Sequence, residues 1–205
     1  MFSPNSIKLS IAPIAWTNDD LPELGRHISF EQCIDEMAAA GFTGSEIGNK
    51  FPKDPDILKH ALEQRGLQIS SAWFSTFFSE KGRIGETVDK YVEHMNFLKL
   101  MGARIVNVCE CGHCIQMKSI HVFDRPEYSN YQWEQVANGL NLIGEIAQEN
   151  DMINAYHYHM GTMVQNFEET GRLMEMTDPS LVYLLLDTGH AHYAGDDPNL
   201  IVQKY

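Results

Sequence analysis

Basic residues are scarce in this chain, which has 15 Lys and Arg against 28 Asp and Glu and a formal net charge of -13. Neutralising a phosphate backbone needs clustered cations, so this balance argues against a nucleic-acid partner. No apolar run approaches the roughly 20 residues that cross a bilayer. The first sixteen residues, MFSPNSIKLSIAPIAW, also lack the basic start, long apolar run and cleavage site of a signal peptide. We therefore expect a cytoplasmic chain with no membrane partner.

Cysteine is equally scarce, and three of the four cysteines crowd into the segment CECGHC at 109–114, with Cys33 far away. This layout is a poor disulfide framework, so we expect reduced thiols. A structural zinc site would need a second pair of ligands at a suitable distance, and the chain has no other cysteine pair. Nothing in the sequence singles out one thiol as activated. Structural zinc and a covalent thiol mechanism both stay open as alternatives.

A glycine-rich phosphate turn is also missing, because IAPIAWTND, which ends the first predicted strand, contains no glycine. That absence disfavours an open doubly wound sheet, which remains the alternative architecture. What the chain does show is a repeated order of strand-length apolar runs and segments of helical periodicity. The predicted strands are 7–15, 42–48, 67–74, 103–110, 152–161 and 181–190. The predicted helices are 30–40, 54–66, 85–101, 131–150, 166–176 and one that begins at 199.

These six βα units predict an α/β fold with a parallel sheet. A (β/α)8 TIM barrel takes about 250 residues, and this chain is shorter. We therefore expect residues 1–205 to form a single, partial TIM-barrel domain, truncated after about six units, with the last two missing. Two open sheet edges would make such a piece unstable or prone to associate, so a homo-oligomer and a non-catalytic interaction role stay open.

Histidines collect where the later strands end. Six of the nine lie at the ends of the strands at 103–110, 152–161 and 181–190 or in the loops after them, and in a parallel barrel these ends form one face. They are His113, His121, His157, His159, His190 and His192. A single histidine near a strand end is more often a hydrogen-bonded structural residue than a ligand. Six at one predicted face favour a functional site.

Two of these strands carry the sharper signals. Along 152–161, side-chain alternation puts His157 and His159 on one side and Tyr156 and Tyr158 on the other. At 181–190, Asp187 ends an apolar run, where a carboxylate is costly unless it is paired, protonated or metal-bound. Imidazoles with a carboxylate suit a divalent transition ion such as Mn, Co, Fe or Zn.

Other strand ends carry polar and aromatic candidates. Glu46 and Glu110 end the strands at 42–48 and 103–110, where a carboxylate can act as a general base or bind substrate, or can simply pair with a neighbouring cation. Trp16 and Asn18 follow the first strand and could line a polyol pocket, although core packing explains the tryptophan equally well.

Four stretches resemble a known family: IAPIAWTNDDLPELG (11–25), AGFTGSEIGNKFP (40–52), AYHYHMGT (155–162) and LLLDTGHAHYAG (184–195). Together they resemble the inosose dehydratases of the xylose isomerase-like barrel superfamily. The resemblance implies a carbon–oxygen lyase of myo-inositol catabolism. Such an enzyme removes water from 2-keto-myo-inositol, a cyclic polyol ketone, and gives a trihydroxycyclohexane-1,2-dione. It also implies Mn or Co as the metal, and glutathione is associated with the family.

The resemblance also suggests roles for residues. The superfamily holds its metal with acidic and His ligands from its last four strands. Asp187 matches the ligand of the sixth strand, whereas His157 stands where the fifth usually supplies Glu; further ligands would follow Tyr205. We expect Asp187 and His157 to bind metal and His190 to orient or protonate a substrate oxygen. We expect Glu46 or His159 to transfer protons. The expected substrate-binding residues are Trp16, Asn18, Lys50 and Glu110.

Two other activities of the same superfamily compete with a dehydratase. A sugar isomerase or epimerase also begins by abstracting a proton next to a carbonyl. A metal-dependent endonuclease relies on similar His-rich strand ends, but the acidic charge counts against it.

Overall fold

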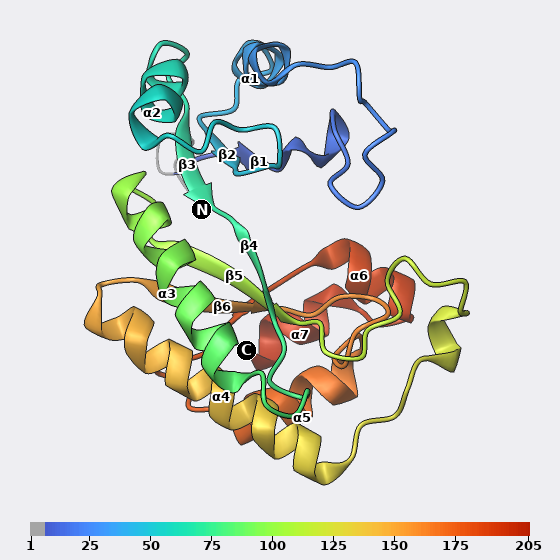
Figure 1. Cartoon of the computed structure of the whole chain (residues 1–205). Helices are drawn as coiled ribbons and strands as arrows, with labels where there is room; N and C mark the ends of the chain where they lie inside the picture. The colour runs from blue at the N-terminus through green and yellow to red at the C-terminus, as the bar shows by residue number, and fades with distance from the viewer. Residues whose placement is uncertain (1–6) are drawn as a thin grey trace. The chain divides into compact units, whose positions relative to one another are not determined.

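A computed structural model describes residues 7–205 of the chain (Figure 1). Residues 1–6, on which part of the signal-peptide assessment rests, lie outside the described residues. The fold consists of two compact units. The first comprises the described residues up to Trp73 together with Asn96–Ile105, and the second comprises Phe74–Met95 together with Val106–Tyr205.

The first unit is built on a three-stranded parallel sheet. Its strands are β1 (Ser10–Ile11), β2 (Gly44–Glu46) and β3 (Gln68–Ser71), in that order. Ser10 pairs with Gly44, and Gly44 pairs with Gln68. Its helices α1 (Phe30–Ala39) and α2 (Pro55–Glu63) lie within the predicted ranges 30–40 and 54–66.

Local chemistry explains where these elements begin and end. The Ser29 hydroxyl accepts the Gln32 amide at the start of α1, and the Asp54 carboxylate caps α2. The predicted strand 7–15 was too long, because Pro13–Ala15 forms a 3-10 helix. Proline cannot donate to a strand ladder, and its fixed φ suits the first turn of a helix.

The second unit contains a four-stranded sheet in the order β4-β5-β6-β7. In the β6–β7 pair, which is parallel, His157 faces Leu185. The strands are β4 (Trp73–Thr76), β5 (Ile105–Glu110), β6 (Ile153–His157) and β7 (Tyr183–Leu185). The remaining helices are α3 (Ile84–Leu100), α4 (Asn130–Glu149), α5 (Phe167–Met176), α6 (Thr188–Ala194) and α7 (Pro198–Lys204), with a 3-10 turn at Val122–Asp124.

Further predicted strands differ from the structure. The range 152–161 was too long, because β6 ends at His157. The range 67–74 forms two strands, β3 and β4, which belong to different sheets. The range 181–190 was wrong beyond Leu185, because the Asp187 side chain accepts the His190 amide and starts α6. An aspartate at this position is a strong helix N-cap, and Gly195 ends the helix with a φ of 90°.

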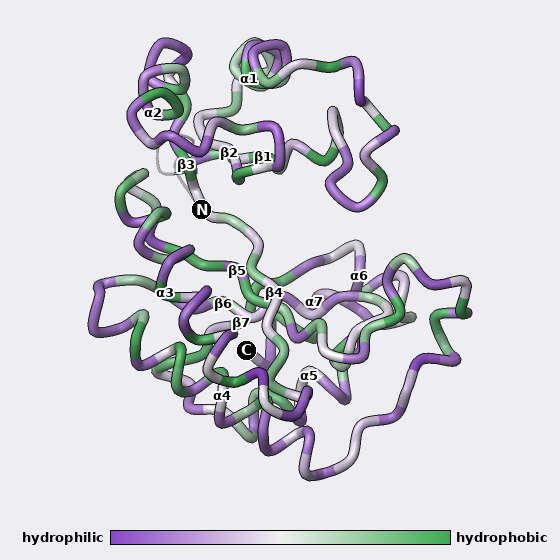
Figure 2. The backbone as a smooth tube through the Cα atoms, viewed as in Figure 1, coloured by the Kyte–Doolittle hydropathy of each residue, from purple (hydrophilic) through white to green (hydrophobic). Residues whose placement is uncertain are grey.

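The core follows the predicted helical patterns. Tyr91, Met95, Leu98 and Met101 are all buried, as the apolar face of 85–101 requires. On α4, the buried residues recur every three or four positions at Val136, Leu140, Ile143 and Ala147, and this helix packs against β6. Apolar and polar residues alternate along the chain in Figure 2.

Two expectations about composition can also be compared with the structure. The four cysteines are free thiols, as predicted. Between residues 7 and 205, no helix combines the length and apolar character needed to cross a bilayer.

Candidate functional site

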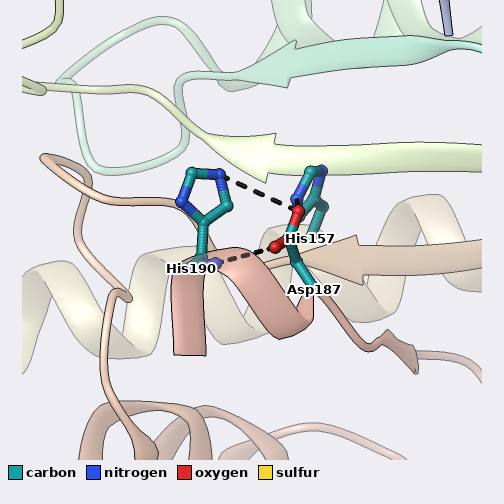
Figure 3. Close-up of side chains that lie close together, drawn as sticks. All are labelled: His157, Asp187 and His190. Atoms are coloured by element: carbon teal, nitrogen blue, oxygen red, sulfur yellow. Dashed lines mark hydrogen bonds and ion pairs between the residues drawn. The ribbon is translucent and has the colours of Figure 1, made fainter. Parts of the chain in front are cut away.

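The ends of β6 and β7 bring three metal-binding side chains together. His157 is the last residue of β6 and pairs with Leu185 on β7. Asp187 lies two residues after Leu185. His190 lies in the first turn of α6. Figure 3 shows the two imidazole rings on either side of the Asp187 carboxylate. Their ligand atoms all lie within 4.8 Å of one another, the only such group of His, Cys, Asp or Glu in the described chain.

The two oxygens of Asp187 have separate tasks. Oδ1 accepts the His190 backbone N–H at 2.7 Å and caps α6. Oδ2 lies 3.1 Å from His157 Nε2 and 4.0 Å from His190 Nε2. Burial raises the pKa of Asp187, but the amide of His190 and the two neighbouring imidazoles outweigh it, so the pKa lies below its usual value. The carboxylate is therefore an anion at neutral pH.

His190 is held in its neutral form. Burial and the neighbouring His159 lower its pKa to about 4, although the charge of Asp187 opposes the shift. The His159 and His190 rings are 3.9 Å apart at their centroids, and those of His157 and His159 are 5.8 Å apart. The predicted shared side of His157 and His159 is therefore confirmed, and His190 joins them.

His159 is held by two polar contacts at Nδ1. This atom lies 2.9 Å from the carbonyl oxygen of Met160 and 3.0 Å from Nε2 of the Gln116 side chain. The carbonyl pairs with an Nδ1–H and the amide N–H pairs with an Nδ1 lone pair, so the ring has a partner at this atom in either tautomer.

Three of the six predicted histidines lie outside this cluster. His113 is exposed near Tyr128, and His121 caps the 3-10 turn by accepting the Phe123 amide. His192 is exposed on α6. Of the two histidines on α6, His190 is the one beside Asp187, and it is the one to which the sequence assigned a role.

Four predicted site residues belong to the first unit, and three of them have contacts that stabilise loops. Asn18 Oδ1 accepts the amides of Asp20 and Leu21. The Lys50 ammonium donates to three backbone carbonyls, those of Gly25, Arg26 and Ile28, at 2.6 to 3.0 Å. All three of its donors therefore have partners in one loop.

Trp16 and Glu46, the other two predicted site residues of the first unit, each form a side-chain hydrogen bond. The Trp16 indole N–H donates to Glu36 at 2.6 Å. Glu46 is the last residue of β2, as predicted, and accepts the Ser71 hydroxyl at 2.7 Å. Their expected roles with substrate or protons remain predictions.

Glu110 ends β5, as predicted, but its carboxylate is fully buried. It accepts hydrogen bonds from Thr76, Phe78, Ser79 and Gly112, at 2.8 to 3.3 Å. Burial raises its pKa, and these donors partly offset the rise. Glu110 thus connects the loops after β4 and β5 through hydrogen bonds. Its contact with substrate stays a prediction.

The sequence reasoning missed two residues around the cluster. The Tyr158 hydroxyl contacts both the N–H and the carbonyl of Asp187, and Gln116 contacts His159. Tyr158 could have been found, since it points to the side of β6 opposite His157, where buried residues lie. No signal marked Gln116, because it lies in an irregular loop.

The chain was compared with known proteins. Residues 34–205 match the family model described as xylose isomerase-like TIM barrel. An inosose dehydratase from Bacillus anthracis is 52% identical over 207 residues, covering 100% of this chain and 69% of the relative, and one from Clostridium tetani is 50% identical over the same length. The chain thus spans about two thirds of these relatives' length.

Solved structures share the fold at lower identity. A probable 3-DHS dehydratase involved in petrobactin synthesis in Bacillus anthracis is 18% identical with a TM-score of 0.72, covering 97% of this chain and 69% of that one. A protein named IOLI, solved with a zinc atom, is 17% identical with a TM-score of 0.66, covering 93% and 66%. The α/β barrel fold expected from the sequence is thereby confirmed. The chain belongs to the xylose isomerase-like TIM-barrel family.

Proposed function

We propose that the protein is an inosose dehydratase, a hydro-lyase that removes water from 2-keto-myo-inositol and gives a trihydroxycyclohexane-1,2-dione. The observation that carries this proposal is 52% identity across the whole chain to enzymes of that name. The cluster of His157, Asp187 and His190 supports it, because it supplies a place for metal-assisted chemistry at the strand ends.

The donor set of this cluster fits a divalent transition ion. Two imidazole nitrogens and one carboxylate oxygen are ligands that Mn, Co, Fe and Zn accept. Ligand atoms about 2.1 Å from a tetrahedral ion lie roughly 3.4 Å from one another. The observed separations from Asp187 Oδ2, 3.1 Å and 4.0 Å, bracket that value. Asp187 is anionic and His190 neutral at pH 7, so both have free lone pairs.

We propose that His157 and Asp187 bind the metal. His190 is close enough to them to be a third ligand or to orient a substrate oxygen. Mn or Co is our proposal for the ion, and the zinc in the IOLI structure supports a metal at this fold. A bound divalent ion would polarise the substrate ketone and stabilise negative charge on its oxygen.

The chain's own residues must move the protons. Loss of water beside a ketone requires removal of the hydrogen on the adjacent carbon and protonation of the departing hydroxyl. We propose His159 as the base, because its imidazole lies beside His190, with the two ring centroids 3.9 Å apart and the ring planes tilted by 56°. A proton removed by His159 would therefore arise beside the group that orients the substrate. Glu46 is the alternative for proton transfer.

The remaining assignments belong to the same proposal. Trp16, Asn18, Lys50 and Glu110 are proposed to contribute to the substrate pocket. We propose a cytoplasmic setting without nucleic acid, in line with the net charge of -13, and we retain glutathione as an associated small molecule and a homo-oligomer as the assembly.

Turnover of 2-keto-myo-inositol tests the proposal. Purified protein with Mn²⁺ or Co²⁺ is expected to produce a compound one water lighter, with the ultraviolet absorption of a conjugated dione. Asp187→Asn should lose both metal and turnover, whereas Asp178→Asn, at an exposed turn, should keep both. Formation of an epimer of unchanged mass would identify an isomerase instead. Full metal content and turnover in Asp187→Asn would contradict the site.

A further inference from the structure

The proposed function makes no use of the segment that follows β5. Cys111 and Cys114 lie there in a C-x-x-C arrangement, and the Cys114 amide donates to the Cys111 carbonyl at 3.2 Å. Such a turn keeps the two Cα atoms within about 7 Å, close to the 4.4–6.8 Å span of disulfides. Each thiol also influences the pKa of the other, as expected of neighbouring groups. The pair is therefore near disulfide geometry while both thiols are free.

The turn between the two cysteines is held in place from several sides. The Gly112 amide donates to Glu110 Oε1 at 3.0 Å, and the Tyr128 hydroxyl donates to the Gly112 carbonyl at 2.7 Å. His113 has a φ of 59°, in the left-handed region. A fixed turn limits how far the thiols can separate, which lowers the entropic cost of closing a bond between them.

The pair is connected to the histidine cluster through one side chain. Cys114 Sγ lies 3.9 Å from Gln116 Oε1, and Gln116 Nε2 lies 3.0 Å from His159 Nδ1. The loop is also fastened beside the cluster by the Ile115 amide, which donates to the Gly161 carbonyl at 3.0 Å. A change in bonding at Cys114 therefore has a short path to His159.

We propose that Cys111 and Cys114 are a redox-active dithiol, which a low-molecular-weight disulfide oxidises to an intramolecular disulfide that alters the surroundings of His159. Cys114 is half-buried and Cys111 is buried, so the Cys114 thiolate attacks the small disulfide first. Its thiolate displaces one thiol from the small disulfide and forms a mixed disulfide. Cys111 then displaces the second thiol. Overall, two protein thiols and one small disulfide give one protein disulfide and two small thiols.

The competing pair is Cys109 with Cys111. Cys109 is fully buried on β5, where residues two apart along an extended strand have Cα atoms about 6.6 Å apart, near the upper limit for a disulfide. Contact with Cys109, together with burial, raises the pKa of Cys111, and contact with Cys111 raises that of Cys114. Exchange should therefore become faster as the pH rises above neutral.

Differential alkylation identifies the oxidised pair in the unaltered protein. The protein is treated with 2-hydroxyethyl disulfide, quenched in denaturant with iodoacetamide, reduced, and labelled with N-ethylmaleimide. Trypsin releases residues 105–118, which contain three of the four cysteines. We expect N-ethylmaleimide on Cys111 and Cys114 only, and an intact mass lower by two hydrogens before reduction. Four thiols that all carry iodoacetamide, or a disulfide between Cys109 and Cys111, would overturn the proposal.

Variants and His159 spectroscopy test the connection. Cys114→Ser should form no disulfide, whereas Cys33→Ser, which removes a buried thiol of the first unit, should form it like the parent protein. Oxidation should shift the His159 ring resonances in the parent protein and be reversed by dithiothreitol. Unmoved His159 resonances after complete oxidation would refute the connection. These readouts do not depend on the proposed function; only an accompanying, reversible loss of dehydratase turnover does.

Discussion

The Tyr158 hydroxyl holds both backbone polar groups of Asp187: it donates to the carbonyl at 2.5 Å and accepts the N–H at 3.1 Å. Tyr158 is buried, and burial raises its pKa to about 12, so the hydroxyl keeps its proton at neutral pH. This one side chain therefore ties the end of β6 to the residue that starts α6. It fixes the carboxylate position against His157.

Removing that hydroxyl should weaken metal binding without removing a ligand. Outer partners that orient ligands typically change metal affinity about 10- to 100-fold, and we expect Tyr158→Phe to raise the dissociation constant for Co²⁺ in that range. Titration followed by the visible absorption of Co²⁺ measures it. Tyr156→Phe is the matched control, because Tyr156, two residues earlier on β6, is equally buried but contacts the Glu110 amide. Equal affinities in both variants would refute the positioning role.

Substitution of His157 should affect metal binding, whereas substitution of His159 should affect turnover. His157→Asn should lower metal affinity, because Nε2 lies 3.1 Å from Asp187 Oδ2. His159→Asn should keep the metal and lower turnover of 2-keto-myo-inositol about 100-fold or more, the usual effect of losing a general base. Metal content and steady-state rates decide between them. Loss of metal in His159→Asn would move that residue into the ligand set.

Stability of the metal-free protein should depend on pH through His190. Its pKa is about 4 in the folded chain against an ordinary value of 6.5. Below pH 6.5 the unfolded chain therefore binds a proton that the folded chain does not, so stability is complete above 6.5 and is lost as the pH falls towards 4. We expect a loss of about 3 kcal/mol from this residue.

Urea unfolding across pH 4 to 7 measures the effect. His190→Gln should flatten the dependence, whereas His192→Gln, exposed on the same helix, should leave it unchanged. The lowered pKa of Asp187 acts in a separate window: its stabilisation is present above the ordinary value of 3.8 and is lost as the pH falls through the folded pKa. An unchanged slope between 4 and 6.5 in His190→Gln would contradict the assignment.

Gly112 should tolerate no side chain. A Cβ there would lie 2.1 Å from Ser79 Oγ and 2.5 Å from Glu110 Oε1. Gly112→Ala should therefore cost about 1–3 kcal/mol of unfolding free energy. Gly85→Ala, in α3 with open space around it, should be neutral or stabilising by up to about 1 kcal/mol. Thermal unfolding of the two variants measures the difference. Equal midpoint temperatures would contradict the prediction, because the loop around Gly112 would then accommodate a side chain.

Lys50 offers a test between a structural and a substrate role. Its ammonium donates to three carbonyls of one loop, so Lys50→Met should lower unfolding free energy by about 2 kcal/mol or more. Lys53→Met should have little effect on the unfolding free energy, because Lys53 is exposed three residues after Lys50. If Lys50→Met kept full stability and instead raised KM, the substrate contact expected from the sequence would be the better account.

The sequence was informative where one periodic pattern determines an element. The buried face of 85–101, the approximate extents of α1 and α2, and the strand ends at Glu46 and Glu110 all followed from such patterns. Asp187 and His157 were also paired correctly, because parallel neighbouring strands end on the same edge. Their contact is 3.1 Å.

The sequence was less informative where a polar residue has two local uses. Asp187 looked like the end of a strand, yet the same carboxylate caps a helix, which shortened β7 to three residues. The contacts of Lys50 and Glu110 could not be predicted: Lys50 donates to the Ile28 carbonyl at 2.6 Å, and Glu110 accepts the Thr76 hydroxyl at 2.8 Å, both far away along the chain. Such partners depend on tertiary packing and leave no local pattern.

The helix cap at Asp187 also restricts how this residue can bind an ion. Oδ1 accepts the His190 amide in the first turn of α6, so Oδ2 is the oxygen that Asp187 would offer to an ion while the cap is kept. One oxygen in place of two would leave more of such an ion open to a substrate with neighbouring carbonyl and hydroxyl oxygens.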